Sequence, residues 1–147
     1  MHNAARSQMA EALLKHIAGD RFEVESAGLE PGVLNPLVVA AMKETGIDIS
    51  QNKTKSVWDF HKQGKRYDYV ITVCDESQAA RCPVFPGKHK AIHWGFPDPA
   101  GFQGTWEEML DKTRKVRDEI KNKITDWVKD PDKDDPLRII INQGPEK

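Results

Sequence analysis

The chain begins with the stretch Met1-His2-Asn3-Ala4-Ala5-Arg6-Ser7-Gln8-Met9-Ala10-Glu11, a short polar loop that runs into a helix. The helix is predicted over residues 7–18 because apolar side chains recur at helical spacing, at Met9, Leu13 and Ile17. The first N–H groups of a helix have no partner within it, and the helix dipole adds partial positive charge there. Arg6 stands at this start, and one guanidinium can hold two oxygens of an anion. The stretch therefore predicts a site for a tetrahedral oxyanion. The alternative is that Ser7 only caps the helix and Arg6 is a solvated charge.

Composition limits the classes of function. A length of 147 residues suits one domain, and 38% hydrophobic with 31% charged residues suits a globular protein. The net charge of -1 predicts no general attraction to nucleic acid or to an anionic membrane. No apolar run reaches about 18 residues and the first residues are polar, so we expect neither a transmembrane helix nor a signal peptide. Two cysteines without a secretion signal indicate a cytoplasmic, reducing location.

Helical patterns alternate with short strand patterns along the chain. Strands are expected at residues 22–26, 67–73 and 89–94, and further helices at residues 36–45, 56–62 and 106–129. Asn35-Pro36 and Thr105-x-x-Glu108 are helix-start signals. This alternation predicts an α/β fold of three layers, with a short parallel sheet flanked by helices. Ligands of such sheets lie at the carboxyl ends of the strands, where Cys74 and Asp98 follow predicted strands.

The two cysteines, Cys74 and Cys82, lie eight positions apart in a polar segment. They can form a pair only if the segment bends, because a disulfide needs close Cα atoms. Pro83, Pro86 and Gly87 favour a mobile loop. From spacing alone, a redox pair and two unrelated thiols both remain open.

Three more runs extend the pattern of the opening stretch: Val73-Cys74-Asp75, Cys82-Pro83-Val84-Phe85-Pro86-Gly87, and His93-Trp94-Gly95-Phe96-Pro97-Asp98-Pro99-Ala100-Gly101. Together they resemble the thioredoxin-coupled arsenate reductases of the low-molecular-weight protein tyrosine phosphatase superfamily, and the resemblance spans about residues 2–125. It implies a low-molecular-weight phosphatase-like fold. The tyrosine phosphatases of this superfamily usually carry aromatic residues after their Asp-Pro. Here Ala100-Gly101 follows, which favours the reductase branch.

The resemblance also implies a mechanism without a cofactor. Arsenate or a phosphate-like oxyanion would be held by the loop residues His2, Asn3, Ala4, Ala5, Arg6 and Ser7. A loop thiolate would attack it while Asp98 donates a proton to the leaving oxygen. Cys74 would then release arsenite and form a disulfide, Cys82 would take over that disulfide, and thioredoxin would reduce it.

The family's nucleophilic cysteine stands six positions before the arginine, which is one position before Met1. We therefore expect a chain truncated at its start, lacking the first strand and the nucleophile and inactive as written. Two alternatives stay open: a low-molecular-weight protein tyrosine phosphatase, and a noncatalytic oxyanion-binding protein.

The end of the chain departs from the family pattern. We expect a phosphatase-like domain over residues 1–129 and a charged linker with a tail over residues 130–147, in which Leu137-Arg138-Ile139-Ile140-Ile141-Asn142 has a strand pattern. A family sheet without its central first strand would expose two unpaired edges. Our hypothesis is that Ile139–Ile141 fills the gap between Phe22–Ser26 and Tyr67–Val73. The alternatives are a flexible tail and an edge strand.

No metal site is predicted, because the histidines show no ligand spacing: His2, His16, His61, His89 and His93. Some family members bind potassium near the loop, and Asn3, Glu11 and Ser26 match that site. Lys55 stands where those members have an aspartate, and a lysine ammonium could occupy the cation's place, so we expect no bound ion. The alternative is that Lys55 is an exposed lysine. Trp94 and Phe96 are expected to pack within the fold, and the remaining tryptophans are expected in the core: Trp58, Trp106 and Trp127.

Overall fold

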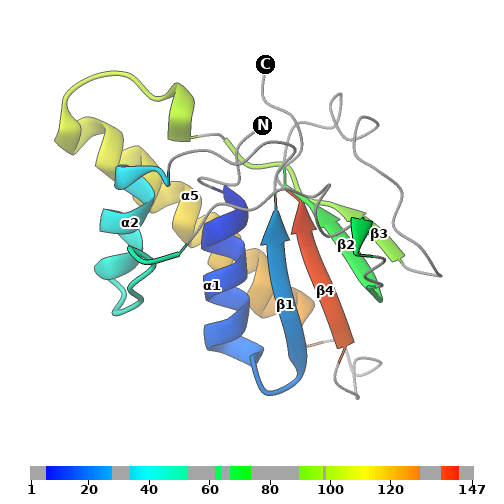
Figure 1. Ribbon diagram of the computed structural model, residues 1–147. Coiled ribbons are helices and arrows are strands. Elements are labelled where there is room, and N and C mark those ends of the chain that lie inside the picture. Colours follow the sequence, from blue (N-terminus) through cyan, green and yellow to red (C-terminus); the bar gives the residue numbers. More distant parts are fainter. Residues whose placement is uncertain are drawn as a thin grey trace.

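The computed structural model describes residues 6–27, 34–52, 62–63, 67–73, 90–97, 99–129 and 137–142. Its centre is a parallel sheet whose strand order in space is β1-β4-β2-β3 (Figure 1). The strands are β1 (Phe22–Ala27), β2 (Tyr69–Thr72), β3 (Lys90–His93) and β4 (Leu137–Asn142). The helices are α1 (Arg6–Ala18), α2 (Pro36–Lys43) and α5 (Trp106–Trp127), with a short 3-10 turn η1 (Pro99–Gly101). The α/β fold class, a parallel sheet flanked by helices, is confirmed.

Strand β4 lies inside the sheet, between β1 and β2. Ile139 is in register with Val24 of β1 on one side and with Tyr69 of β2 on the other, and both pairings are parallel. Ile139, Ile140 and Ile141 are fully buried. The hypothesis that this segment fills the central gap is therefore confirmed, and the tail and edge-strand alternatives are wrong. An apolar strand with ladders on both sides suits this position because a parallel sheet buries both of its faces.

One face of the sheet forms the main core. Helices α1 and α5 pack against each other, α1 packs on β1 and β4, and α2 packs on α5. Residues 139 and 141 point to this face and join Met9 and Leu13 of α1. At one end of the core, Trp127 is surrounded by three aromatic rings at centroid distances of 5.1–5.7 Å, those of Phe22, Tyr69 and Trp94. The expectation that Trp94 and Trp127 pack within the fold is confirmed.

Alternation along the strands directs Ile140 and Val70 to the opposite face of the sheet. Both are buried, so that face is covered as well. Because Val70 and Ile140 are also partners in register, they extend the central packing from β4 into β2.

The predicted helix starts are present. The Asn35 side chain accepts a hydrogen bond from the Leu37 N–H at 2.9 Å, and Thr105 and Glu108 form a reciprocal capping box. After α2 the chain turns at Gly46, whose φ of 84° lies in the left-handed region that glycine adopts without strain. Strand β2 is shorter than predicted at both ends, and β3 ends one residue earlier than predicted. The predicted first residue of β3, His89, lies outside the described residues.

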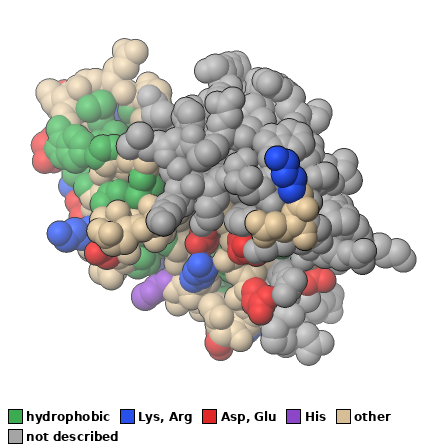
Figure 2. All heavy atoms as spheres, viewed as in Figure 1, with side chains coloured by type: hydrophobic (Ala, Val, Ile, Leu, Met, Phe, Trp, Pro, Cys, Tyr) green, Lys and Arg blue, Asp and Glu red, His purple; other side chains and the backbone are tan. Residues whose placement is uncertain are grey.

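Trp106 corrects the sequence prediction. It is 46% exposed, so the expectation that it belongs to the core is wrong. The buried stripe of α5 starts only at Leu110, one turn further on. Hydrophobic side chains gather on the surface over α2 and the amino end of α5 (Figure 2). Trp58 and most of the predicted helix over residues 56–62 lie outside the described residues.

Candidate oxyanion site

The start of α1 lies at the carboxyl edge of the sheet. The turn Gly19–Arg21 joins α1 directly to β1, so the helix runs antiparallel to that strand. Since all four strands are parallel, Arg6 is at the end where β1, β4, β2 and β3 finish, as the ribbon shows for β1 and β4 (Figure 1). This is the edge at which parallel sheets bind ligands.

Arg6 is a buried charge at this edge. It is 5% exposed, and its Nη1 donates a hydrogen bond of 2.9 Å to the main-chain carbonyl oxygen of Phe96. A solvated arginine has neither property, so the alternative that Arg6 is a surface charge is wrong. Ser7, the second residue of α1, is fully buried as well.

A second layer of polar groups supports the first turns of α1. The buried Glu11 carboxylate accepts hydrogen bonds from the Ser26 hydroxyl and from the Lys15 ammonium, the latter at 2.9 Å. Glu11 is 5% exposed, and burial of a carboxylate requires such partners. Gln8, also fully buried, accepts a hydrogen bond from the Asn52 side-chain amide at 3.2 Å. These contacts fix α1 to β1 and to the segment after α2.

These contacts involve two of the residues that match the potassium site of some family members. Glu11 and Ser26, two of the residues that match the family's ion site, are brought together. Among the described residues, Lys15 lies one helical turn away and places its ammonium on this carboxylate. Asn3 and Lys55 lie outside the described residues, so the role expected of Lys55 stays a prediction.

Several predicted site residues also fall outside the described part of the chain, namely Cys74, Cys82, Asp98, His2, Asn3, Ala4 and Ala5. Their sequence neighbours are described. Val73 is fully buried directly after β2, and Pro97 follows Phe96. Of the predicted set, the structure therefore brings Arg6 and Ser7 to the carboxyl edge, together with the segment that leads to Asp98.

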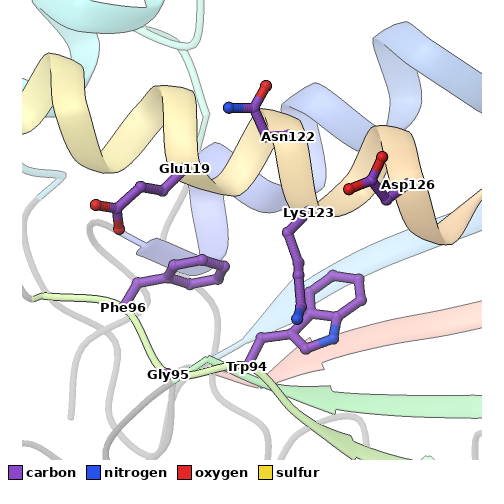
Figure 3. Close-up of a pocket in the computed structure, with 7 residues that line it drawn as sticks. All are labelled: Trp94, Gly95, Phe96, Glu119, Asn122, Lys123 and Asp126. Carbon is purple, nitrogen blue, oxygen red and sulfur yellow. The ribbon is translucent and has the colours of Figure 1, made fainter.

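A cleft of about 400 Å³ lies between residues 94–96 and α5. In Figure 3 the Phe96 and Trp94 rings form one wall, and Glu119, Lys123 and Asp126 extend from the helix on the other side. The Phe96 ring is half-buried and packs partly on the core. The main chain of this residue contacts Arg6 while its side chain lines the cleft.

Sequence reasoning missed the Phe96 carbonyl and the Gln8–Asn52 contact. The carbonyl belongs to the main chain, and 90 positions separate it from Arg6, so no residue pattern signals it. Within the described ranges, no cluster of three potential metal ligands occurs. No helix in those ranges has the length and apolarity that crossing a membrane requires.

The comparison with sequence families gives one match. A family model described as low molecular weight phosphotyrosine protein phosphatase matches residues 1–137. This chain belongs to that family. The match ends where β4 begins, so most of the central strand lies beyond the matched residues.

Relatives of the family resemble the chain over most of its length. The arsenate reductase of Bacillus subtilis is 46% identical over 125 residues, which cover 85% of this chain and 88% of that protein. A solved arsenate reductase in the phosphate binding state superposes with a TM-score of 0.67 at 28% identity, covering 87% of this chain and 91% of the other. A thioredoxin-dependent arsenate reductase of Corynebacterium glutamicum gives a TM-score of 0.53 at 33% identity, over 86% of this chain and 59% of that one.

Proposed function

We propose that this family member is an arsenate reductase that binds arsenate at the start of α1 and transfers electrons through Cys74 and Cys82. The observation that carries the proposal is the buried Arg6 at the carboxyl edge of the sheet, bonded to the segment that leads to Asp98. The Bacillus subtilis relative named arsenate reductase supports the substrate, and the solved relative in a phosphate binding state supports oxyanion binding.

The proposed reaction has two chemical stages. In the first, a thiolate displaces an oxygen of arsenate held by Arg6, and Asp98 protonates that oxygen as it leaves. In the second, Cys74 attacks the sulfur that carries arsenic. The electron pair of the sulfur–arsenic bond reduces arsenic from the pentavalent to the trivalent state, and arsenite leaves as a disulfide forms. Cys82 then attacks Cys74, which frees the first thiol and leaves a Cys74–Cys82 disulfide.

The Cys74–Cys82 disulfide has to be reduced for another turnover. A dithiol of the thioredoxin class fits this role, and the thioredoxin-dependent relative supports it. This cycle requires a reducing compartment, so we infer a cytoplasmic location. No resident cofactor takes part in it.

The cycle uses three thiols, and residues 1–147 contain two cysteines, at positions 74 and 82. The first stage therefore needs a thiol besides Cys74 and Cys82. The intact mass of the native protein and its coding sequence test whether one is present. A mass larger than that of residues 1–147, with a codon for a further cysteine, would support the cascade. A mass equal to residues 1–147 would contradict it and would favour a noncatalytic oxyanion-binding protein.

The activity is tested by arsenate-dependent oxidation of NADPH in the presence of thioredoxin and thioredoxin reductase. We expect Cys74→Ser and Cys82→Ser each to abolish turnover, while arsenate binding persists. A parallel assay with p-nitrophenyl phosphate separates the tyrosine phosphatase alternative, because that activity needs neither Cys74 nor Cys82. Arsenate turnover that survives both substitutions would refute the proposed cascade.

A further inference from the structure

The hydrogen bond between Arg6 and Phe96 joins the start of α1 to the segment that follows β3. Its donor is Nη1 of Arg6 and its acceptor is the Phe96 carbonyl oxygen, 2.9 Å away. Since Arg6 is 5% exposed, water competes little for this bond. The contact can therefore fix the orientation of the guanidinium, and we call it the tether.

The acceptor itself is held on two sides. Two residues before it, Trp94 is 6% exposed and packs edge-on against Trp127 with ring centroids 5.7 Å apart. Phe96 packs its ring partly on the core. The next residue is Pro97, whose ring restricts the backbone and whose nitrogen carries no hydrogen. The packing of Trp94 and Phe96 and the ring of Pro97 thus restrict the position of the Phe96 carbonyl on both sides.

A guanidinium can bind one carbonyl and one oxyanion at the same time. It is planar and has five N–H donors in a fixed fork. A bond through Nη1 uses one corner, and a guanidinium can bind a tetrahedral oxyanion through another edge, such as that formed by Nε and Nη2. A carbonyl that fixes Nη1 also fixes the plane of the group, so that this edge has a set direction before the anion arrives. Binding then loses less side-chain freedom.

We propose that the Phe96 carbonyl is the positioning group for Arg6, and that the segment Trp94–Pro97 sets the oxyanion affinity of the site through it. This inference rests on the proposed function, because it assigns a role in oxyanion binding. The positioning group is a main-chain atom, and its position depends on the Phe96 ring and on Pro97.

The test uses inorganic phosphate as the probe and titration calorimetry on the whole chain. Phe96→Ala removes the packing that holds the carbonyl, and we expect the dissociation constant for phosphate to rise about tenfold. Phe96→Leu keeps an apolar side chain and should restore the affinity to within about threefold. Pro97→Gly changes an exposed residue, leaves the core intact and loosens the same carbonyl, so it should weaken binding in the same direction by about threefold.

A matched control separates positioning from a general loss of stability. Ile17→Ala also removes a partly buried apolar side chain that packs on the core. Position 17 is eleven residues along α1 from Arg6, about 16 Å at the rise of an α-helix. This control should lower the melting temperature and leave the phosphate dissociation constant within about twofold of the wild type.

A spectroscopic readout follows the tether directly. In protein labelled with ¹⁵N-arginine, a guanidinium held at Nη1 gives separate Nη resonances because rotation about its C–N bond is slowed. Arg6→Lys assigns the signal by removing it. We expect the separate signals in the wild-type chain without phosphate, and their merging in Phe96→Ala.

The outcomes distinguish the positioning role of Phe96 from the proposed oxyanion site itself. Unchanged phosphate affinity in Phe96→Ala and Pro97→Gly would overturn the positioning role while leaving the proposed function intact. A wild-type chain that does not bind phosphate, with Arg6→Lys no different, would overturn the proposed oxyanion site and with it the affinity role of Phe96. Averaged Nη resonances of Arg6 in the wild type would overturn the tether itself.

Discussion

The central position of β4 makes a sharp prediction for Ile141→Ala. Ile141 is fully buried and is in register with Ser26 on one side and Ile71 on the other. The substitution removes three carbon atoms, which corresponds to about 2.4 kcal/mol at about 0.8 kcal/mol for each buried carbon. The cavity that remains adds to this loss, and buried isoleucine-to-alanine changes cost about 2–5 kcal/mol. We expect the free energy of unfolding to fall by about 3–4 kcal/mol.

The assay is urea unfolding, followed by far-ultraviolet circular dichroism and by tryptophan fluorescence. Trp127 reports well because its ring contacts Phe22 and Tyr69, which belong to the strands on either side of β4. For a chain of this size, each kcal/mol lowers the melting temperature by roughly 2–4 °C, so we expect a decrease of about 10 °C.

Ile47→Ala is the matched control. Ile47 packs on the same core from outside the sheet and is only partly buried, so the identical substitution should cost about 1 kcal/mol. If Ile141→Ala costs less than about 1 kcal/mol, β4 is not a packed central strand. Substitutions in a loose tail stay within about 0.5 kcal/mol.

Three further predictions concern polar contacts. The hydrogen bond from Arg114 lowers the pKa of Glu44 to about 2, from 4.5. Because the folded pKa lies below the unfolded one, this stabilisation is complete above pH 4.5 and is lost as the pH falls toward 2. Urea midpoints of Glu44→Gln and wild type should therefore converge on acidification, and a constant difference would contradict the assignment. Ser26→Ala removes a buried hydrogen bond to the Glu11 carboxylate and should cost about 1.5–3 kcal/mol in urea unfolding, whereas a neutral effect would exclude that contact as a support of α1. Thr105→Ala removes the cap of α5 and should cost about 0.5–2 kcal/mol, with Thr105→Ser retaining most of the stability; equal losses in both variants would argue against capping.

The fold was predictable where periodicity and helix-start signals act locally. The helix over residues 7–18 follows from its apolar spacing, and the start of α5 follows from the Thr105 capping box. Strand ends were less predictable, because residues such as Asp68 and Trp94 flank a ladder without joining it. The prediction that Trp106 lies in the core was wrong. Helical spacing predicts which face of a helix is buried, but it does not predict where the elements packed against that face end.

The candidate site was predictable in its residue types and unpredictable in its contacts. The opening stretch named Arg6 because the chemistry of an anion-binding helix start is local. The acceptor of its hydrogen bond is a backbone atom of Phe96, and backbone atoms are the same at every position. The contact between Lys15 and Glu11 was missed for a different reason. Ion pairs at i and i+4 are common on helices, and this pair is notable because Glu11 is buried.

The position of β4 links the stability of the sheet to the geometry of the site. Arg6 is carried by α1, which packs on β1, while Phe96 follows β3 at the other edge of the sheet. In the strand order β1-β4-β2-β3, the backbone hydrogen bonds of β4 join β1 to the β2–β3 pair. The 2.9 Å bond between Arg6 and Phe96 therefore spans two parts of the molecule that β4 holds in register. A substitution such as Ile141→Ala acts far along the chain from Arg6, yet it should weaken phosphate binding as well as stability. The two effects would separate only if α1 kept its place against residues 94–97 without the central strand.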